Sequence, residues 1–369
     1  MLIRIIIIIS LFFLSSCQES NSTKEQSQPT TAADKDKTYQ WRLITTWPKN
    51  YPGLGTAPEN LSKLVAKMSG GRFKIQVFGA GEIVPAFEVF DAVSQGTVEM
   101  GHGAAYYWRG KVKASAFFTA VPFGLTAQEM NGWLHYGGGM ALWQELYEPH
   151  DLIPLASGNT GVQMAGWFNK EIKSVADLAG LKMRIPGLGG EVLKQAGGTP
   201  VTMPGSELYT AMQTGNIDAT EWVGPYNDLA FGLHETAKYY YYPGWHEPGP
   251  TLEAIVNKKA WQALPEDLRE ILKVASRAIN QDMLDEYTAR NNDALNELVT
   301  KHKIEVRKLP DDVLAKLKTI SDQVVADMAK ENELASRIYQ SYADYKTRVI
   351  NYHRISEQAY INARDAASP

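Results

Sequence analysis

The 369-residue sequence lacks the features that mark several large functional classes. It has one cysteine, so no disulfide can form within the chain. It has no long basic run and its formal net charge is −4, so nucleic acid is not an expected partner. A zinc-protease His-Glu-x-x-His motif, a Gly-x-Ser-x-Gly nucleophile elbow and a Walker loop are all absent. Its 7 histidines show no transition-metal spacing. These absences favour a binding protein over an enzyme.

The single cysteine, Cys17, lies where a secretory signal would be cleaved. Residues 1–16 contain a charged start, a mainly apolar run from Ile5 to Leu14 and then Ser15-Ser16, which is typical of an exported protein. The stretch Leu14-Ser15-Ser16-Cys17 resembles the bacterial lipobox, so we expect a periplasmic lipoprotein anchored to the membrane through Cys17. A plain signal peptide is the alternative. Residues 17–38 are polar and are expected to form a flexible tether.

The remaining length is enough for two domains. From Tyr39 onward, strands alternate with helices, and the predicted order is strand 39–47, helix 60–68, strand 73–78, helix 88–94 and strand 98–100. This order is typical of an α/β domain with a largely parallel sheet. We predict a first lobe from residues 39–127 and 251–300, a second lobe from residues 128–250, and C-terminal helices at 301–369.

A short internal repeat supports two similar lobes. Residues 90–99 (FDAVSQGTVE) align without gaps with residues 209–218 (YTAMQTGNID), including the glycine that ends each predicted helix. Open α/β sheets bind ligands outside the carboxyl ends of their strands. The repeat therefore predicts a ligand cleft between the lobes, with residues 101–108 and 220–225 facing each other.

Three polar residues, Gln163, Arg184 and Glu221, each lie at the end of a short apolar run. The guanidinium of an arginine fits a carboxylate, whereas glutamine and glutamate oxygens suit a cation. We therefore predict a pocket for a small organic acid. His246 and Glu247 lie where the chain is expected to cross back between the lobes. A hydrolase that uses Glu221 and His246 around a metal is an alternative.

The C-terminal third is predicted to be helical, with helices beginning at Pro265, at Pro310 and at Glu331. The last helix, Glu331–Ala363, carries a stripe of aliphatic and tyrosine side chains. This stripe is either a homodimer surface or a face that packs on its own chain.

Two stretches, Lys182-Met183-Arg184-Ile185-Pro186 and Gly215-Asn216-Ile217-Asp218-Ala219, carry a family resemblance. Together with export and a helical C-terminus, they resemble the substrate-binding proteins of TRAP transporters (tripartite ATP-independent periplasmic transporters). The resemblance implies a two-lobed α/β fold of the type II periplasmic binding protein kind. Three further stretches, 158–163, 220–222 and 245–247, resemble the branch that binds 2-oxo acids and lactate with a cation.

That branch implies roles for individual residues. Arg184 would pair with the substrate carboxylate, and sodium or calcium would be held by Gln163, Glu221, Glu247 and the carbonyl of Trp222. The remaining substrate contacts would be Tyr106, Tyr107, Asn159, Gln163, Trp222 and Glu247. The implied partners are TRAP membrane permease subunits and a second copy of the chain. A ligand-binding sensor lipoprotein, or a binding protein for another organic acid, stays open as an alternative.

Overall fold

The computed structural model describes residues 37–366. The predicted signal peptide, Cys17 and nearly all of the predicted tether therefore lie outside the described residues. Among the described helices, none is both long enough and apolar enough to cross a membrane.

The first sheet has five strands in the order β2-β1-β3-β10-β4. Their bounds are β1 (Tyr39–Thr45), β2 (Phe73–Phe78), β3 (Met100–Gly103), β4 (Leu152–Asn159) and β10 (Thr251–Asn257). Strands β1, β2 and β3 are parallel, as predicted, whereas β10 runs antiparallel to both β3 and β4. The carboxyl ends of β1, β3 and β4 therefore meet at one edge of this sheet.

The second sheet has six strands in the order β11-β9-β5-β8-β6-β7. Their bounds are β5 (Gly166–Phe168), β6 (Lys182–Arg184), β7 (Thr199–Val201), β8 (Ala219–Thr220), β9 (Tyr239–Tyr242) and β11 (Glu305–Lys308). Strand β6 is parallel to β7 and β8, while β5 runs antiparallel to β8 and β9. Two mixed sheets with flanking helices confirm the predicted α/β class.

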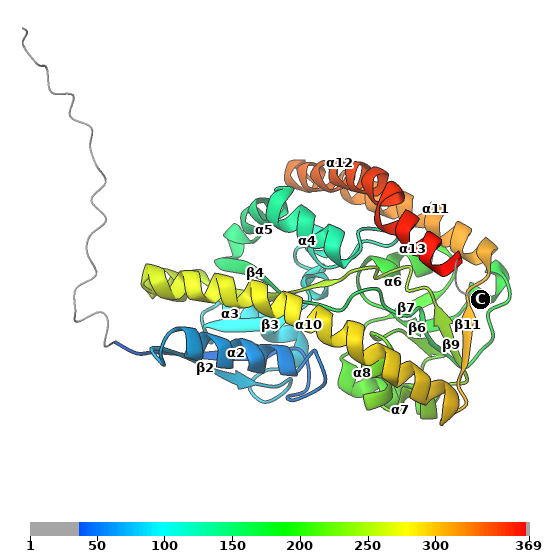
Figure 1. The fold of residues 1–369 in the computed structure, drawn as a ribbon, viewed down its shortest axis with the longest axis horizontal. Coiled ribbons are helices and arrows are strands. Elements are labelled where there is room, and N and C mark those ends of the chain that lie inside the picture. Colours follow the sequence, from blue (N-terminus) through cyan, green and yellow to red (C-terminus); the bar gives the residue numbers. More distant parts are fainter. Residues whose placement is uncertain (1–36, 367–369) are drawn as a thin grey trace, which may run out of the picture. The chain divides into compact units, whose positions relative to one another are not determined.

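The chain crosses between the sheets three times. It passes to the second sheet between β4 and β5, returns between β9 and β10, and passes again along α10 (Glu266–Thr300). Helix α10 contacts β4 of the first sheet and then α8 (Pro225–Ala230) of the second, as Figure 1 shows. Its buried positions recur at helical spacing, so one apolar face links both halves of the fold.

The other helices cover the sheets or one another. Helices α2 (Thr56–Met68) and α3 (Val89–Ser94) pack on β2 and β3, and α5 (Gly139–Tyr147) packs on β4 beside α4 (Ala127–Tyr136). Helix α11 (Asp311–Met328) packs on α6 (Gly187–Gln195). The remaining helices are α7 (Leu208–Gln213), α9 (Lys258–Ala263), α12 (Glu333–Ile355) and α13 (Glu357–Ala366).

The internal repeat is confirmed by local structure. Helix α3 and strand β3 correspond to α7 and β8, and the two aligned glycines, Gly96 and Gly215, have φ values of 74° and 70°. Those left-handed conformations suit glycine and end each helix in the same way. The acid that follows also has the same role, because Glu99 accepts the backbone N–H of Arg42 at 2.8 Å and Asp218 accepts that of Lys182 at 3.0 Å.

The predicted extent of the last helix was wrong, and two strands lie in unexpected sheets. The last helix is interrupted at Ser356, whose φ of −112° and ψ of −98° lie outside the helical region. Strand β4 falls in the range assigned to the second lobe but pairs in the first sheet, and β11 falls among the predicted C-terminal helices but pairs in the second. Partner strands decide sheet membership, and a strand's own residues do not reveal them. Since residues 38–366 belong to one compact unit, the lobe boundaries stay a prediction.

Candidate functional site

Arg184 and Glu221 lie side by side at the carboxyl ends of two neighbouring parallel strands. Arg184 ends β6 opposite Thr220 of β8, and the backbone N–H of Glu221 donates to the Arg184 carbonyl at 3.1 Å. Their side chains are 1% and 0% exposed and form an ion pair through Nη1 and Oε1. Taking two charges out of water is costly unless further groups compensate them. Their burial therefore marks this strand edge as a functional candidate.

Gln163, His246 and Glu247 come from the two crossing segments that join the sheets. The backbone N–H of Gln163 donates to the Glu247 carbonyl at 3.1 Å, so the segments run side by side. A Cβ added at Gly244 would lie 2.1 Å from the Gln163 carbonyl oxygen, so only glycine permits this approach. Both crossing segments thus bring polar side chains to Arg184 and Glu221.

The site residues fit a cation. One ligand atom each from Glu221, His246 and Glu247 lies within 4.8 Å of the others, and all three residues are buried. Among the described residues, Oε1 of Gln163, Oε2 of Glu221 and Oε2 of Glu247 have no hydrogen-bond partner. Buried polar atoms rarely stay unpaired. Carboxylate and amide oxygens are ligands that sodium and calcium accept.

Burial shifts the pKa values of the charged groups at this site. It raises the pKa of the Glu247 carboxyl well above its usual value, and the charge of Glu221 raises it further, while Arg184 opposes both effects. For Arg184, burial would lower the pKa, but the charge of Glu221 and the hydroxyls of Tyr106 and Tyr107 leave it raised. Arg184 is therefore a permanent positive charge, and a bound cation would favour ionised Glu247.

Aromatic side chains from both halves of the fold cover Arg184. The guanidinium carbon lies 5.1 Å from the centroid of the Trp222 ring. Tyr106 and Tyr107 lie in a 3₁₀ helix, η2 (Ala105–Trp108), which begins after β3 ends. Gly187 at the start of α6 has a φ of 63°, and a Cβ there would lie 3.1 Å from Tyr106 Cδ1. The glycine therefore lets the second half approach Tyr106 closely.

The structure brings most of the predicted site residues to one small cavity. Of the predicted substrate contacts, those that line it are Tyr106, Tyr107, Gln163, Arg184, Trp222 and Glu247. Asn159 does not line it. Its side chain donates to the Gly249 carbonyl at 3.2 Å and accepts from the Gly161 N–H at 2.9 Å, which holds the crossing segments together. The roles of these residues in binding stay predictions.

Sequence reasoning missed several residues that also line the cavity, namely Trp47, Leu54, Thr160, Val223 and Leu252. Trp47 could have been found, because it follows the carboxyl end of β1 as the other candidates follow their strands. Tyr51, which contacts Trp222 but does not line the cavity, carried no such signal. Its hydroxyl accepts from Trp222 Nε1 at 3.2 Å and donates to the Asn227 carbonyl at 2.5 Å, across the two halves.

Two further buried carboxyls support the walls of the site. Burial raises the pKa of Glu253 in β10 to about 8, although Trp108 Nε1 and the Tyr147 hydroxyl donate to it. Burial likewise raises the pKa of Asp228 to about 7, and Asp228 accepts the backbone N–H of Val223 at 3.2 Å. Neither carboxyl lines the cavity. The protonation states of Glu253 and Asp228 therefore affect the stability of the fold more directly than ligand binding.

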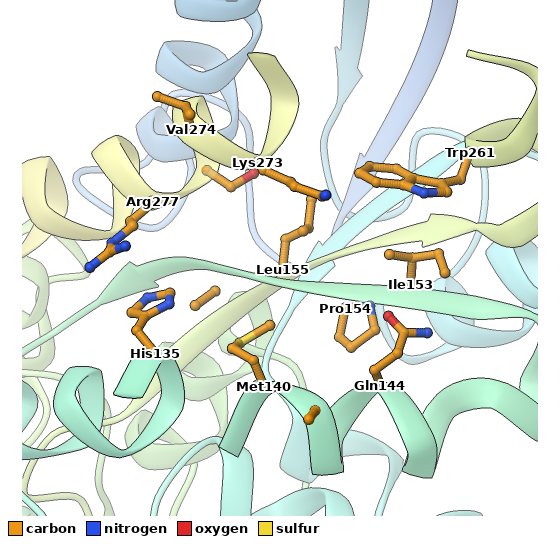
Figure 2. Close-up of a pocket in the computed structure, with 13 residues that line it drawn as sticks. His135, Met140, Gln144, Ile153, Pro154, Leu155, Trp261, Lys273, Val274 and Arg277 are labelled. Atoms are coloured by element: carbon orange, nitrogen blue, oxygen red, sulfur yellow. The ribbon is translucent and has the colours of Figure 1, made fainter. Parts of the chain in front are cut away.

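A second cavity, of about 540 Å³, lies beside β4, an edge strand of the first sheet, between α5 and α10. Figure 2 shows its mainly apolar side chains, with His135, Lys273 and Arg277 as the basic groups. None of the residues that line it is acidic. It lacks the combination of a buried arginine and an unpaired acidic oxygen that Arg184 and Glu247 provide in the smaller cavity, so the smaller cavity is the candidate site.

Together, the fold and the site define an α/β binding protein whose candidate site lies on the segments joining two sheets. A family model described as bacterial extracellular solute-binding protein, family 7, matches residues 43–332. The chain belongs to this family.

Named relatives are similar over nearly the whole chain. The monocarboxylate 2-oxoacid-binding periplasmic protein of Nostoc sp. is 43% identical over 351 residues, covering 95% of this chain and 93% of the relative. A TRAP periplasmic solute-binding protein from Pseudoalteromonas atlantica, with bound sodium and pyruvate, is 43% identical with a TM-score of 0.86, covering 88% of this chain and 99% of that one.

A TRAP solute-binding protein from Bordetella bronchiseptica is 38% identical with a TM-score of 0.88, covering 90% of this chain and 98% of that one. That structure is a mixed-occupancy dimer with copurified calcium and picolinate in one active site. The resemblance to TRAP solute-binding proteins drawn from the sequence is confirmed, including the branch whose members hold a 2-oxo acid with a cation.

Proposed function

We propose that this protein captures a small monocarboxylate bearing a 2-oxo or 2-hydroxy group, such as pyruvate or lactate, together with a cation, and presents it to TRAP membrane permease subunits. One observation carries the proposal. The permanently charged Arg184 is buried beside carboxylate and amide oxygens that have no partner among the described residues. An acid and a cation together would satisfy both sets of groups.

Arg184 would bind the carboxylate. Its Nη2 has no hydrogen-bond partner among the described residues, and its Nη1 is paired with Glu221. A guanidinium binds a carboxylate through two parallel N–H donors, and such pairs are strongest in a dry site. Trp222 would keep the guanidinium plane in place by stacking on it.

Gln163, Glu221, Glu247 and the carbonyl of Trp222 would hold sodium or calcium. The cation supplies positive charge that compensates the carboxylates of Glu221 and Glu247 beside an anionic ligand. These groups are oxygen donors, and the free oxygens of Gln163, Glu221 and Glu247 have no hydrogen-bond partner among the described residues. Both features support this assignment. The names of relatives that bind sodium or calcium with an organic acid support it as well.

The acid is bound and released without being turned over. Tyr106, Tyr107 and Trp222 would cover its apolar part when the two halves close around it. After incubation of the protein with ¹³C-pyruvate and the cation, NMR should show only the starting acid. The appearance of a product signal would replace this function with an enzymatic one.

Membrane anchoring through Cys17 and homodimer formation complete the proposal. Cys17 would carry the lipid, and a Cys17→Ser variant should move from the membrane fraction to the soluble fraction. The exposed side chains Tyr352, Ile355 and Tyr360 of α12 and α13 would form the dimer surface. Light scattering should give a dimer mass for the soluble form, and a Tyr360→Glu variant should be a monomer.

Calorimetry tests the central assignment. Pyruvate, 2-oxobutyrate and lactate should each release or absorb heat when titrated into protein containing sodium or calcium. Mass spectrometry of ligand that copurifies with the native protein should identify a small monocarboxylate. Absence of heat with all three acids in both cation buffers contradicts the assignment.

A further inference from the structure

The cavity beside β4 has no part in the proposed function. It measures about 540 Å³, and none of the residues that line it lines the smaller cavity at Arg184. Sites for small molecules usually enclose about 300–1,000 Å³ and combine a mainly apolar wall with a few polar groups. The size and the lining of this cavity are therefore those of a separate ligand site.

The basic groups of this cavity are free to meet an anion. Lys273, Ser276 and Arg277 share one face of α10, and His135 of α4 lies on the facing side (Figure 2). Lys273 pairs with Glu270 at 2.7 Å, but Glu270 is 57% exposed and does not line the cavity. Arg277 forms no ion pair with any described residue. Positive charge at the cavity is thus only partly compensated.

Two buried polar atoms at this cavity also lack a partner. The Ser276 side chain is 1% exposed, and neither its Oγ nor the buried Nε2 of His135 has a hydrogen-bond partner among the described residues. A buried serine in a helix often donates to the carbonyl one turn back, as Ser321 does to Leu317 at 2.7 Å. Buried polar atoms rarely stay unpaired. An occupant with acceptor oxygens would pair the Ser276 hydroxyl.

The rest of the wall is apolar and adjoins the charged groups. Ile153 and Leu155 of β4 line it together with Trp261 of α9, whose ring centroid lies 5.7 Å from Lys273 Nζ. An occupant would therefore need an anionic head and an apolar body. A peptide strand added to the edge of the sheet is disfavoured, because Pro154 of β4 has no backbone N–H and proline on an edge strand discourages pairing.

We propose that this cavity is a second ligand site, which binds an organic acid with an apolar body, such as a medium-chain fatty acid. The carboxylate of the acid would pair with Arg277 and Ser276, and its chain would lie against β4 and Trp261. Pyruvate has only a methyl group to place on that surface, so the two sites take different acids. The inference does not rest on the proposed function.

Calorimetry with octanoate tests the second site. Octanoate is titrated into protein that is already saturated with pyruvate and calcium, and the expected result is one octanoate per chain. Losing a hydrogen bond to a charged group costs at least about tenfold in affinity. Octanol, which has the same chain and no charge, should therefore bind at least about tenfold more weakly. Arg277→Gln should lower octanoate affinity by a similar factor, and Ser276→Ala should lower it as well.

Two further variants separate this cavity from the rest of the surface. Arg290→Gln removes an exposed arginine of the same helix that does not line the cavity, and it should leave octanoate affinity unchanged. Ala141 of α5 lines the cavity and is exposed, so Ala141→Trp fills the space without disturbing the core. This variant should lose octanoate binding and keep the pyruvate affinity of the wild type.

Absence of heat with octanoate overturns the inference, and so does equal affinity for octanoate and octanol. Octanoate affinity that is the same in the wild type, Arg277→Gln and Ala141→Trp overturns it too. Loss of octanoate binding in Arg184→Met, or displacement of pyruvate by octanoate, would place octanoate in the smaller cavity instead. The titration without pyruvate should give the same stoichiometry, so the second site can fail or stand whether or not pyruvate binds.

Discussion

Replacing Arg184 with methionine should have two separable effects, one on stability and one on binding. The side chains of Arg184 and Glu221 are 1% and 0% exposed, so the substitution leaves the Glu221 carboxylate buried without its partner. Breaking a buried ion pair by removing one member costs about 3–5 kcal/mol. Removing both charges, in Arg184→Met with Glu221→Gln, should recover most of that loss because no charge remains to be compensated.

Binding should not recover with stability. Truncating one partner of a buried, hydrogen-bonded charge pair costs at least about 2 kcal/mol, which is roughly a thirtyfold loss of affinity. Pyruvate would lose its carboxylate partner in both the single and the double variant. The free energy of unfolding is measured by urea denaturation in cation-free buffer, and the dissociation constant of pyruvate by calorimetry with calcium present.

A control comes from the surface, where Arg337 pairs with Glu145 and both side chains are about half exposed. Arg337→Met should change stability by less than about 1 kcal/mol and leave pyruvate affinity unaltered. If Arg184→Met is as stable as the double variant, the buried Glu221 carboxylate needs no compensating charge from Arg184, contrary to this prediction. Micromolar pyruvate affinity in Arg184→Met would show that another group binds the carboxylate.

Three further predictions follow from the same structure. Glu253 has a folded-state pKa of about 8, above its ordinary value of 4.5, so the unfolded state loses its proton first and stability falls as pH rises between these values. The fall in the free energy of unfolding from pH 5 to pH 8 is on the order of 4 kcal/mol, and Glu253→Gln should remove it in urea denaturation. Parallel pH profiles of the wild type and the variant would contradict this prediction. Gly187→Ala should weaken pyruvate binding in calorimetry, because φ is 63° and the new Cβ meets Tyr106, and unchanged affinity would disprove the need for glycine. Tyr51→Phe leaves Trp222 Nε1 without its partner and should cost about 1–3 kcal/mol by thermal unfolding, whereas an unchanged melting temperature would show that this bond adds nothing.

The sequence predicted those parts of the site that follow from local pattern. Arg184 and Glu221 end short apolar runs, and in the structure those runs are neighbouring parallel strands whose carboxyl ends meet. Glu247 was predicted where the chain crosses back between the lobes and Gln163 at the end of an apolar run, and the two residues lie on the two crossing segments. Strand ends and crossings can be read from periodicity and turn residues, so these residues could be found.

Contacts that depend on packing between distant segments could not be found in this way. Tyr51 meets Trp222 only because two halves of the fold close on each other, and no periodicity marks it. Asn159 has the side chain of a ligand contact, but that side chain is hydrogen-bonded to backbone groups of both crossing segments. The membership of β4 in the first sheet depends on its pairing with β10, nearly a hundred residues further along the chain.

If acid and cation bind as one unit at Arg184, Gln163, Glu221 and Glu247, the affinity for each must depend on the presence of the other. The dissociation constant of pyruvate is measured by calorimetry in metal-stripped protein with and without saturating calcium, and that of calcium with and without pyruvate. Thermodynamic linkage requires calcium to tighten pyruvate binding by the same factor by which pyruvate tightens calcium binding. We expect this factor to be at least about ten. Equal pyruvate affinity in the presence and absence of the cation would show that the acid binds independently of the cation.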